Sequence, residues 1–112
     1  MMPESISTRE WGHMMFSDTE IIAGAIRSLS VIEFGYDGFR RVFWPYALGK
    51  MKTGETELFG WQQLSGKGGQ PDFRQFRLSN LTGLVVTGSH FERPLQPVDP
   101  ERRGFVRVIA QI

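Results

Sequence analysis

The apolar residues that follow Ser17 recur with the period of an α-helix. Ser17 and Glu20 form a capping box, in which each residue satisfies a backbone N–H of the first helical turn. Phe16, just before the cap, can pack against the first apolar residue of the helix. The pattern predicts a helix over residues 18–28 that packs one face on a core. The apolar positions on this face are Ile21, Ile22, Ala25, Ile26 and Leu29.

From Ser30 onward the hydrophobic period changes to two. Ile32, Phe34 and Tyr36 fall on one face of a predicted strand. Asp37-Gly38 follows it and is typical of a tight hairpin turn, because both central residues of a type I′ turn have positive φ. The same alternation, punctuated by turn residues, predicts further strands over residues 40–51, 55–63, 72–78, 83–88 and 104–112.

Two residues inside these strands indicate irregular geometry. Pro45 has no N–H for a strand ladder and predicts an edge strand or a bulge. Gly60 predicts a bend or a close approach of two backbones. The proline-rich residues 92–103 are expected to carry the chain across one face, so that the last strand adds to an edge.

These elements define a mainly β (α+β) fold. We expect a small SH3-like or Sm-like β-barrel of five to six antiparallel strands, preceded by one helix. Residues 17–112 form a single domain in this interpretation, and residues 1–16 form an N-terminal arm. The arm carries an apolar cluster suited to docking on the domain or on a partner subunit. The cluster consists of Trp11, Met14, Met15 and Phe16.

Composition narrows the function classes. The 112 residues contain no cysteine, which excludes disulfides and thiol chemistry. The net charge is only +1, which argues against a general polyanion binder, although residues 38–112 carry eleven basic against six acidic side chains. No segment has the apolar length of a membrane span and no signal peptide is evident, so a cytoplasmic protein is expected.

Enzyme chemistry has no support in the sequence. His13 and His90 are isolated and lack metal-ligand spacing, so neither a metal nor another cofactor is expected. The segment SGKGG lacks the spacing of a phosphate-binding P-loop. Glu55 and Glu57 share a strand face beside lysines, where surface ion pairs explain them. We therefore expect a binding domain and no enzyme.

The arginines in the strands are better candidates for function. Arg74 and Arg77 fall on opposite faces of one predicted strand, and Arg40 and Arg41 on opposite faces of another. An arginine beside Tyr36, or beside Trp44 or Trp61, can grip a planar or phosphorylated ligand, because it combines a bidentate fork with stacking on a ring. The alternative is that these arginines only cover apolar neighbours with their aliphatic stems.

The order of motifs resembles the WYL domain family of bacterial regulators. The resemblance runs from about residue 21 to residue 89. It rests on the helix IIAGAIRSL, the strand VIEFGYDG ending in the family's tyrosine, and RRVFWPYALG with its proline. It also includes LFGWQQ and the segment FRQFRLSNLTGLVV.

The chain also departs from the family's pattern. The tripeptide that names the family falls at Thr56, Glu57 and Leu58, of which only the leucine fits. Ser79 or Asn80 stands where an acidic residue is usual. Most relatives carry an N-terminal helix-turn-helix that residues 1–16 cannot supply, so the chain resembles the short, nearly standalone branch of the family.

The resemblance implies a sensor domain for transcription or defence systems. Its ligand would be a small anion, a nucleotide or a short nucleic acid, and a partner protein would receive the signal. By matching position the implied ligand contacts are Tyr36, Arg41, Arg74 and Arg77, with Arg77 favoured; Arg40 replaces Arg41 if the hairpin register shifts by one.

A second function remains open at this point. The apolar arm and an exposed edge strand would also suit a protein-interaction module, acting by homodimerisation or docking without a small ligand.

Overall fold

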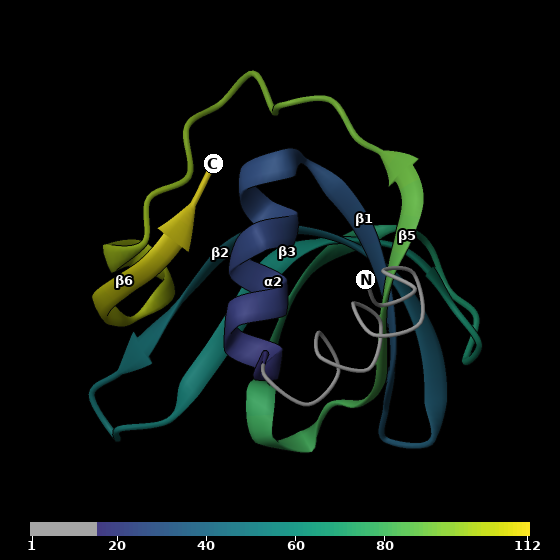
Figure 1. Cartoon of the computed structure of the whole chain (residues 1–112), viewed down its shortest axis with the longest axis horizontal. Helices are drawn as coiled ribbons and strands as arrows, with labels where there is room; N and C mark the ends of the chain where they lie inside the picture. Colours follow the sequence, from purple (N-terminus) through teal and green to yellow (C-terminus); the bar gives the residue numbers. More distant parts are fainter. Residues whose placement is uncertain (1–15) are drawn as a thin grey trace, which may run out of the picture.

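The computed structural model describes residues 16–112, and the arm predicted for residues 1–16 lies outside this range apart from Phe16. One α-helix and six strands follow each other along the chain, with two short 3₁₀ turns between the later strands (Figure 1). The helix is α2 (Asp18–Ser28). The strands are β1 (Ser30–Tyr36), β2 (Phe39–Met51), β3 (Thr56–Ser65), β4 (Asp72–Arg77), β5 (Thr82–His90) and β6 (Phe105–Gln111); the 3₁₀ turns are η1 (Leu78–Asn80) and η2 (Glu101–Arg103).

Helix α2 begins and ends as its sequence predicts. The Ser17 side chain accepts a hydrogen bond from the backbone N–H of Glu20 at 3.2 Å, which confirms the N-cap. Leu29 closes the helix in the left-handed conformation with φ 55°, and β1 starts at the next residue. Ile22 and Ile26 of the predicted apolar face are fully buried against the sheet.

The six strands form one antiparallel sheet in the order β4-β3-β2-β1-β5, with β6 added to β2. Strand β2 is long enough to have two partners on one side. Its first part pairs with β1, and its last part, from Ala47 to Met51, pairs with β6. Within residues 16–112 no pairing joins β4 to β5, so the sheet is not closed into a barrel.

Pro45 and Gly60 lie opposite each other where the sheet bends. The edge-strand alternative for Pro45 is wrong, because β2 pairs with three strands, but the bulge is confirmed by a register shift between Pro45 and Ala47. Pro45 also lies between the residues of β2 that pair with β1 and those that pair with β6, where fewer ladder hydrogen bonds are needed. A Cβ at Gly60 would collide with the Trp44 carbonyl oxygen, which confirms the close backbone approach.

The β1–β2 hairpin turns at Asp37 and Gly38, whose φ angles are 52° and 81°. Both are positive, as a type I′ turn requires. This turn fixes the register that pairs Phe34 with Arg41 and Tyr36 with Phe39.

The sheet carries a hydrophobic cluster on each face. The inner face packs on α2, as Figure 1 shows, and contains Phe34, Phe43, Leu58 and Phe76. Part of the outer face packs against the segment between β5 and β6, which arches over one end of the molecule in Figure 1. This outer cluster consists of Val31, Tyr46, Ala47, Phe59, Phe91 and Phe105.

Candidate functional site

Polar side chains from three neighbouring strands share the inner face of the sheet, and Asp72, which pairs with Gln62, lies on this face as well. Arg41 pairs with Phe34 of the inner core, and Gln62 on β3 pairs with Phe43 of the same core. Arg74 lies two residues before Phe76 on β4 and therefore on the same face. We call Arg41, Gln62 and Arg74 the inner polar cluster.

Arg41 is the buried member of this cluster. Only 7% of the residue is exposed. Its Nη1 donates to Oε1 of Gln62 at 3.0 Å, and its Nη2 donates to the backbone carbonyl of Tyr36 at 3.0 Å. The guanidinium carbon lies 5.5 Å from the ring centroid of Phe76. Both hydrogen-bond partners are neutral, so the arginine is held in place without its charge being neutralised.

The charge of Arg41 is uncompensated among residues 16–112. None of the ion pairs in this part of the chain involves Arg41, and its buried Nε has no hydrogen-bond partner. A buried charge normally has an ionic partner, since the cost of removing it from water is several kcal/mol. Arg41 therefore keeps a positive charge without an ion-pair partner within residues 16–112, and part of its hydrogen-bonding capacity is unused.

Tyr36 holds the arginine in position through its backbone. Its ring lies 4.6 Å from that of Phe76, and its hydroxyl oxygen accepts the backbone N–H of Arg77 at 3.3 Å. Tyr36 thus ties β1 to the end of β4 while its carbonyl orients Arg41. The aromatic neighbours of Arg41 are accordingly Phe76 and Tyr36, whereas Trp44 and Trp61 pack with the outer cluster.

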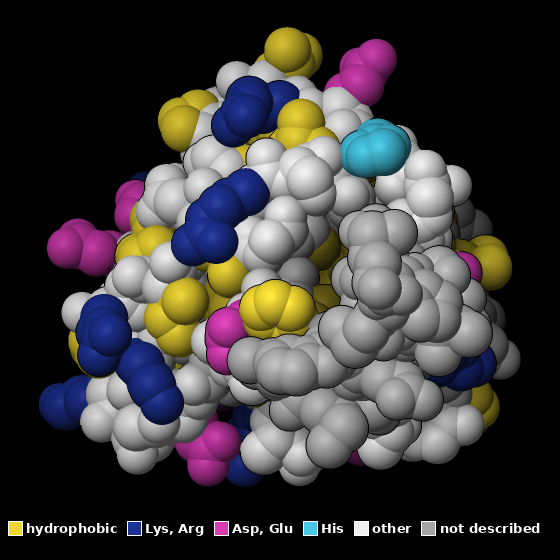
Figure 2. Space-filling model, in the orientation of Figure 1, with side chains coloured by type: hydrophobic (Ala, Val, Ile, Leu, Met, Phe, Trp, Pro, Cys, Tyr) yellow, Lys and Arg dark blue, Asp and Glu magenta, His cyan; other side chains and the backbone are white. Residues whose placement is uncertain are grey.

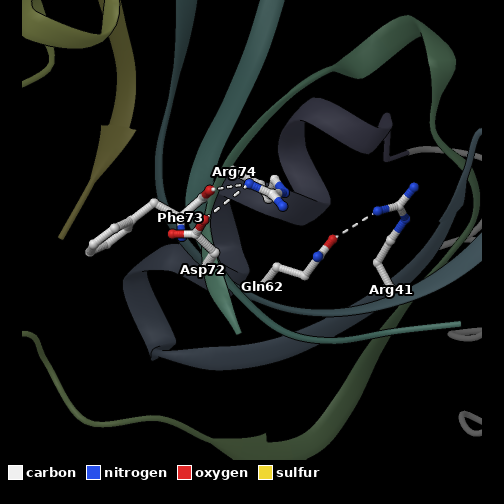
Figure 3. Close-up of polar contacts among 5 residues, drawn as sticks. All are labelled: Arg41, Gln62, Asp72, Phe73 and Arg74. Carbon is white, nitrogen blue, oxygen red and sulfur yellow. Dashed lines mark hydrogen bonds and ion pairs between the residues drawn. The ribbon is translucent and has the colours of Figure 1, made fainter. Parts of the chain in front are cut away.

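Arg74 forms the exposed end of the cluster. Its Nη1 contacts Oδ2 of Asp72 at 3.2 Å, and about half of each side chain is exposed. Figure 3 shows the Gln62 amide directed at Arg41, while Phe73 points away from Arg74 on the other side of the strand. Because Gln62 pairs with Asp72 in the β3–β4 register, the polar groups run from buried Arg41 to solvent-exposed Arg74.

Arg77 and Arg40 lie outside the inner polar cluster. Arg77 pairs with Glu57 on the outer face, one residue beyond Phe76, so the residue favoured by the family resemblance is not beside Arg41. Arg40 also points outward, where it contacts Glu33 at 3.5 Å and the carbonyl of Gly83 at 3.1 Å. The predicted division of Arg74 from Arg77, and of Arg40 from Arg41, onto opposite faces is confirmed.

Gln62 is the member of the cluster that the sequence interpretation missed. It is only 4% exposed. The available signal was the alternation Leu58, Gly60, Gln62, which puts a polar amide on the face that Leu58 assigns to the core. Such a residue predicts a buried hydrogen-bond partner, because buried amides are rarely left unpaired.

Residues 16–112 contain no group of three or more His, Asp or Glu side chains suited to a metal ion. No helix in this part of the chain is long and apolar enough to cross a membrane. The chain matches no protein-family model, no curated protein and no solved structure.

Proposed function

We propose that this chain is a ligand-sensing domain that binds a small anion, such as a nucleotide or the end of a short nucleic acid, through Arg41 and Arg74. The observation that carries the proposal is the buried guanidinium of Arg41, which has no ionic partner and a free Nε among the described residues. A phosphate or carboxylate would supply the missing charge and accept hydrogen bonds from the Nη1 and Nη2 end of the guanidinium, since Nε itself is buried. Arg74 would contact the ligand after releasing Asp72.

We also propose that this open sheet is an unclosed variant of the Sm-like or SH3-like barrel implied by the WYL resemblance. A helix precedes the strands, and the single turn η1 connects β4 and β5, the two ends of the strand order. Binding at the inner face would then alter the packing of Tyr36, which bonds to both β2 and the end of β4. A partner protein would detect this change.

A small ligand is favoured over a long nucleic acid. Figure 2 shows one face of the molecule, on which the basic side chains are scattered among acidic and hydrophobic ones. The affinity of nonspecific nucleic-acid binding depends on many simultaneous phosphate contacts. The two arginines of the inner polar cluster suffice for one phosphate group only.

The test is a calorimetric titration of the wild-type chain with three ligands: inorganic phosphate, adenosine monophosphate and a short single-stranded oligonucleotide. The informative variants are Arg41→Met and Arg74→Gln. Arg40→Gln is the matched control, because this neighbouring arginine is exposed on the opposite face. We expect Arg41→Met to abolish binding, Arg74→Gln to weaken it by about tenfold, as expected for one charged hydrogen bond, and Arg40→Gln to leave it unchanged.

Two results would overturn the proposal. One is that the wild type binds none of the three anions. The other is that Arg40→Gln weakens binding as much as Arg41→Met, because binding would then depend on the general surface charge.

The second candidate function is homodimerisation through β5. This strand ends the sheet and has one strand neighbour among the described residues, and its Val85 and Val86 are 52% and 43% exposed. An edge strand with exposed valines is suited to antiparallel pairing with a second copy. Light scattering at rising concentration should show a dimer that Val85→Lys dissociates and that Val106→Lys on β6 leaves intact. A wild-type chain that stays monomeric would exclude this function.

A further inference from the structure

A hollow lies on the outer face of the sheet, under the proline-rich segment that precedes β6. Its floor consists of Tyr46, Phe59 and Phe73 from β2, β3 and β4. Pro97 and Val98 form a wall, and Arg103 closes one side. The volume is about 300 Å³, at the lower end of the range for small-molecule sites.

The floor of this hollow is aromatic. The rings of Phe59 and Phe73 are stacked, with centroids 5.6 Å apart and planes inclined by 15°. Tyr46 meets both rings edge-on, at 6.3 and 6.4 Å. Phe59 and Tyr46 are buried, whereas Phe73 remains 45% exposed and provides the open part of this aromatic surface. A planar ring would be accommodated by stacking on it.

Arg103 adds a directed positive charge to the aromatic floor. Its guanidinium carbon lies 4.2 Å from the Phe59 centroid and 5.9 Å from the Phe73 centroid. The backbone is fixed at this point, because Gln75 donates to the Arg103 carbonyl at 2.9 Å and the Arg103 N–H donates to the Pro100 carbonyl at 3.0 Å. None of the ion pairs within residues 16–112 involves Arg103, so its planar fork of N–H donors is available.

The remaining charges of the hollow also favour an anion. Arg102 and Arg103 face a single acid, Asp99, whose contact with Arg102 is long, at 3.9 Å, and exposed to solvent. Weak surface pairs of this kind exchange readily with an incoming charge.

We propose that this outer hollow is a binding site for a small planar aromatic ring that carries an anionic group. The ring stacks on Phe73 beneath Pro97, and the anion binds the fork of Arg103. The site lies on the opposite face of the sheet from Arg41, since Phe73 and Phe59 alternate with the inner residues of their strands. It is therefore independent of the function proposed for the inner polar cluster.

The experiment is a titration of the full chain with benzoate and phenyl phosphate as probes, monitored by NMR at the Arg103 side-chain N–H and the Gly104 amide. Acetate and inorganic phosphate test the anion without a ring, and benzyl alcohol tests the ring without an anion. We expect at least one aromatic anion to shift the Arg103 and Gly104 signals saturably, with an affinity at this hollow about tenfold higher than that of any of these three controls. A preference between benzoate and phenyl phosphate distinguishes a carboxylate ligand from a phosphate ligand.

Variants identify the site. Arg103→Gln should weaken binding by about tenfold, and Arg103→Lys should weaken it less, because lysine keeps the charge but loses the planar fork. Arg107→Gln is the matched control on β6, outside the hollow, and it should leave the titration of the Arg103 and Gly104 signals unchanged. Thermal melting verifies that each variant is folded.

The proposal fails if neither aromatic anion shifts the Arg103 and Gly104 signals saturably, or if acetate and inorganic phosphate shift these signals with equal affinity. It also fails if folded Arg103→Gln and Arg103→Lys both bind like the wild type. In these cases Arg103 only anchors the proline-rich segment to Phe59.

Discussion

The hydrogen bond between Arg41 and Gln62 allows the stability and the function of the inner polar cluster to be separated. Arg41→Met removes a buried charge but leaves Oε1 of Gln62, in a residue only 4% exposed, without its donor. The carbonyl of Tyr36 also loses its bond from Nη2. An unsatisfied buried acceptor costs about 1–3 kcal/mol, so the single variant should be destabilised by an amount of this order.

The double variant Arg41→Met, Gln62→Leu removes both the charge and the amide. Replacing a buried charged group and its partner by apolar residues of similar size is commonly neutral, or stabilising by about 1–4 kcal/mol. The thioether introduced in place of the guanidinium would keep a favourable contact with the ring of Phe76. We therefore expect the double variant to be about 1–3 kcal/mol more stable than Arg41→Met, and at least as stable as the wild type.

Urea denaturation monitored by circular dichroism measures these differences, provided that the free energy of unfolding has the same dependence on urea concentration in every variant. Arg40→Met is the control, because its exposed contact with Glu33 should contribute about 1 kcal/mol or less. The reasoning is refuted if the double variant is no more stable than Arg41→Met. Arg41 and Gln62 would then be a net stabilising pair, and a structural role would suffice to explain them.

Three further predictions concern single residues of the fold. Gly60→Ala should lower the free energy of unfolding, measured by urea denaturation, by at least about 2 kcal/mol, because the new Cβ collides with the Trp44 carbonyl. The control Gly24→Ala, which places its Cβ in open space on α2, should raise the free energy of unfolding by about 0.5–1 kcal/mol. Ser17→Ala should lower the same quantity by about 1 kcal/mol through loss of the N-cap, and an unchanged urea midpoint would contradict this. Burial raises the pKa of Tyr46 above its ordinary value of 10.0. The stability that this shift contributes is therefore complete below pH 10.0 and is lost as the pH rises through the higher pKa of the folded state. Urea denaturation from about pH 9 to about pH 11 should show a decline in the free energy of unfolding, and Tyr46→Phe should make this decline smaller.

Local patterns were sufficient to predict most of the fold. The helix over residues 18–28 and the Asp37-Gly38 turn are confirmed, because caps and tight turns are determined by neighbouring residues. Of the two alternatives for Pro45, the bulge is confirmed and the edge strand is wrong, and the error has a different origin. Strand β2 changes partner from β1 to β6 near this residue, and β6 lies more than fifty residues further along the chain.

The site was predictable only in part, because its residues are also brought together by contacts between strands far apart in the sequence. Alternation placed Arg40 and Arg41 on opposite faces but could not decide which face is buried, because that depends on the packing of α2 and on the residues of β3. The family resemblance favoured Arg77, whose strand position directs it to the outer face. The alternation Leu58, Gly60, Gln62 indicated a buried amide, but the identity of its partner, Arg41, depends on the long-range pairing of β2 with β3.

The neutral amide at position 62 is the strongest argument that Arg41 serves a ligand. Glutamate has the same length as glutamine and would place a carboxylate oxygen at the position from which Gln62 contacts Arg41, 3.0 Å from Nη1. If Arg41 had only a structural role, Gln62→Glu would supply the missing counter-charge without functional loss. In a ligand site, the internal carboxylate would instead occupy the N–H donors and repel the incoming anion. We therefore expect Gln62→Glu to fold and to bind adenosine monophosphate at least about tenfold more weakly than the wild type; equal affinity would contradict the assignment of Arg41 as an anion receptor.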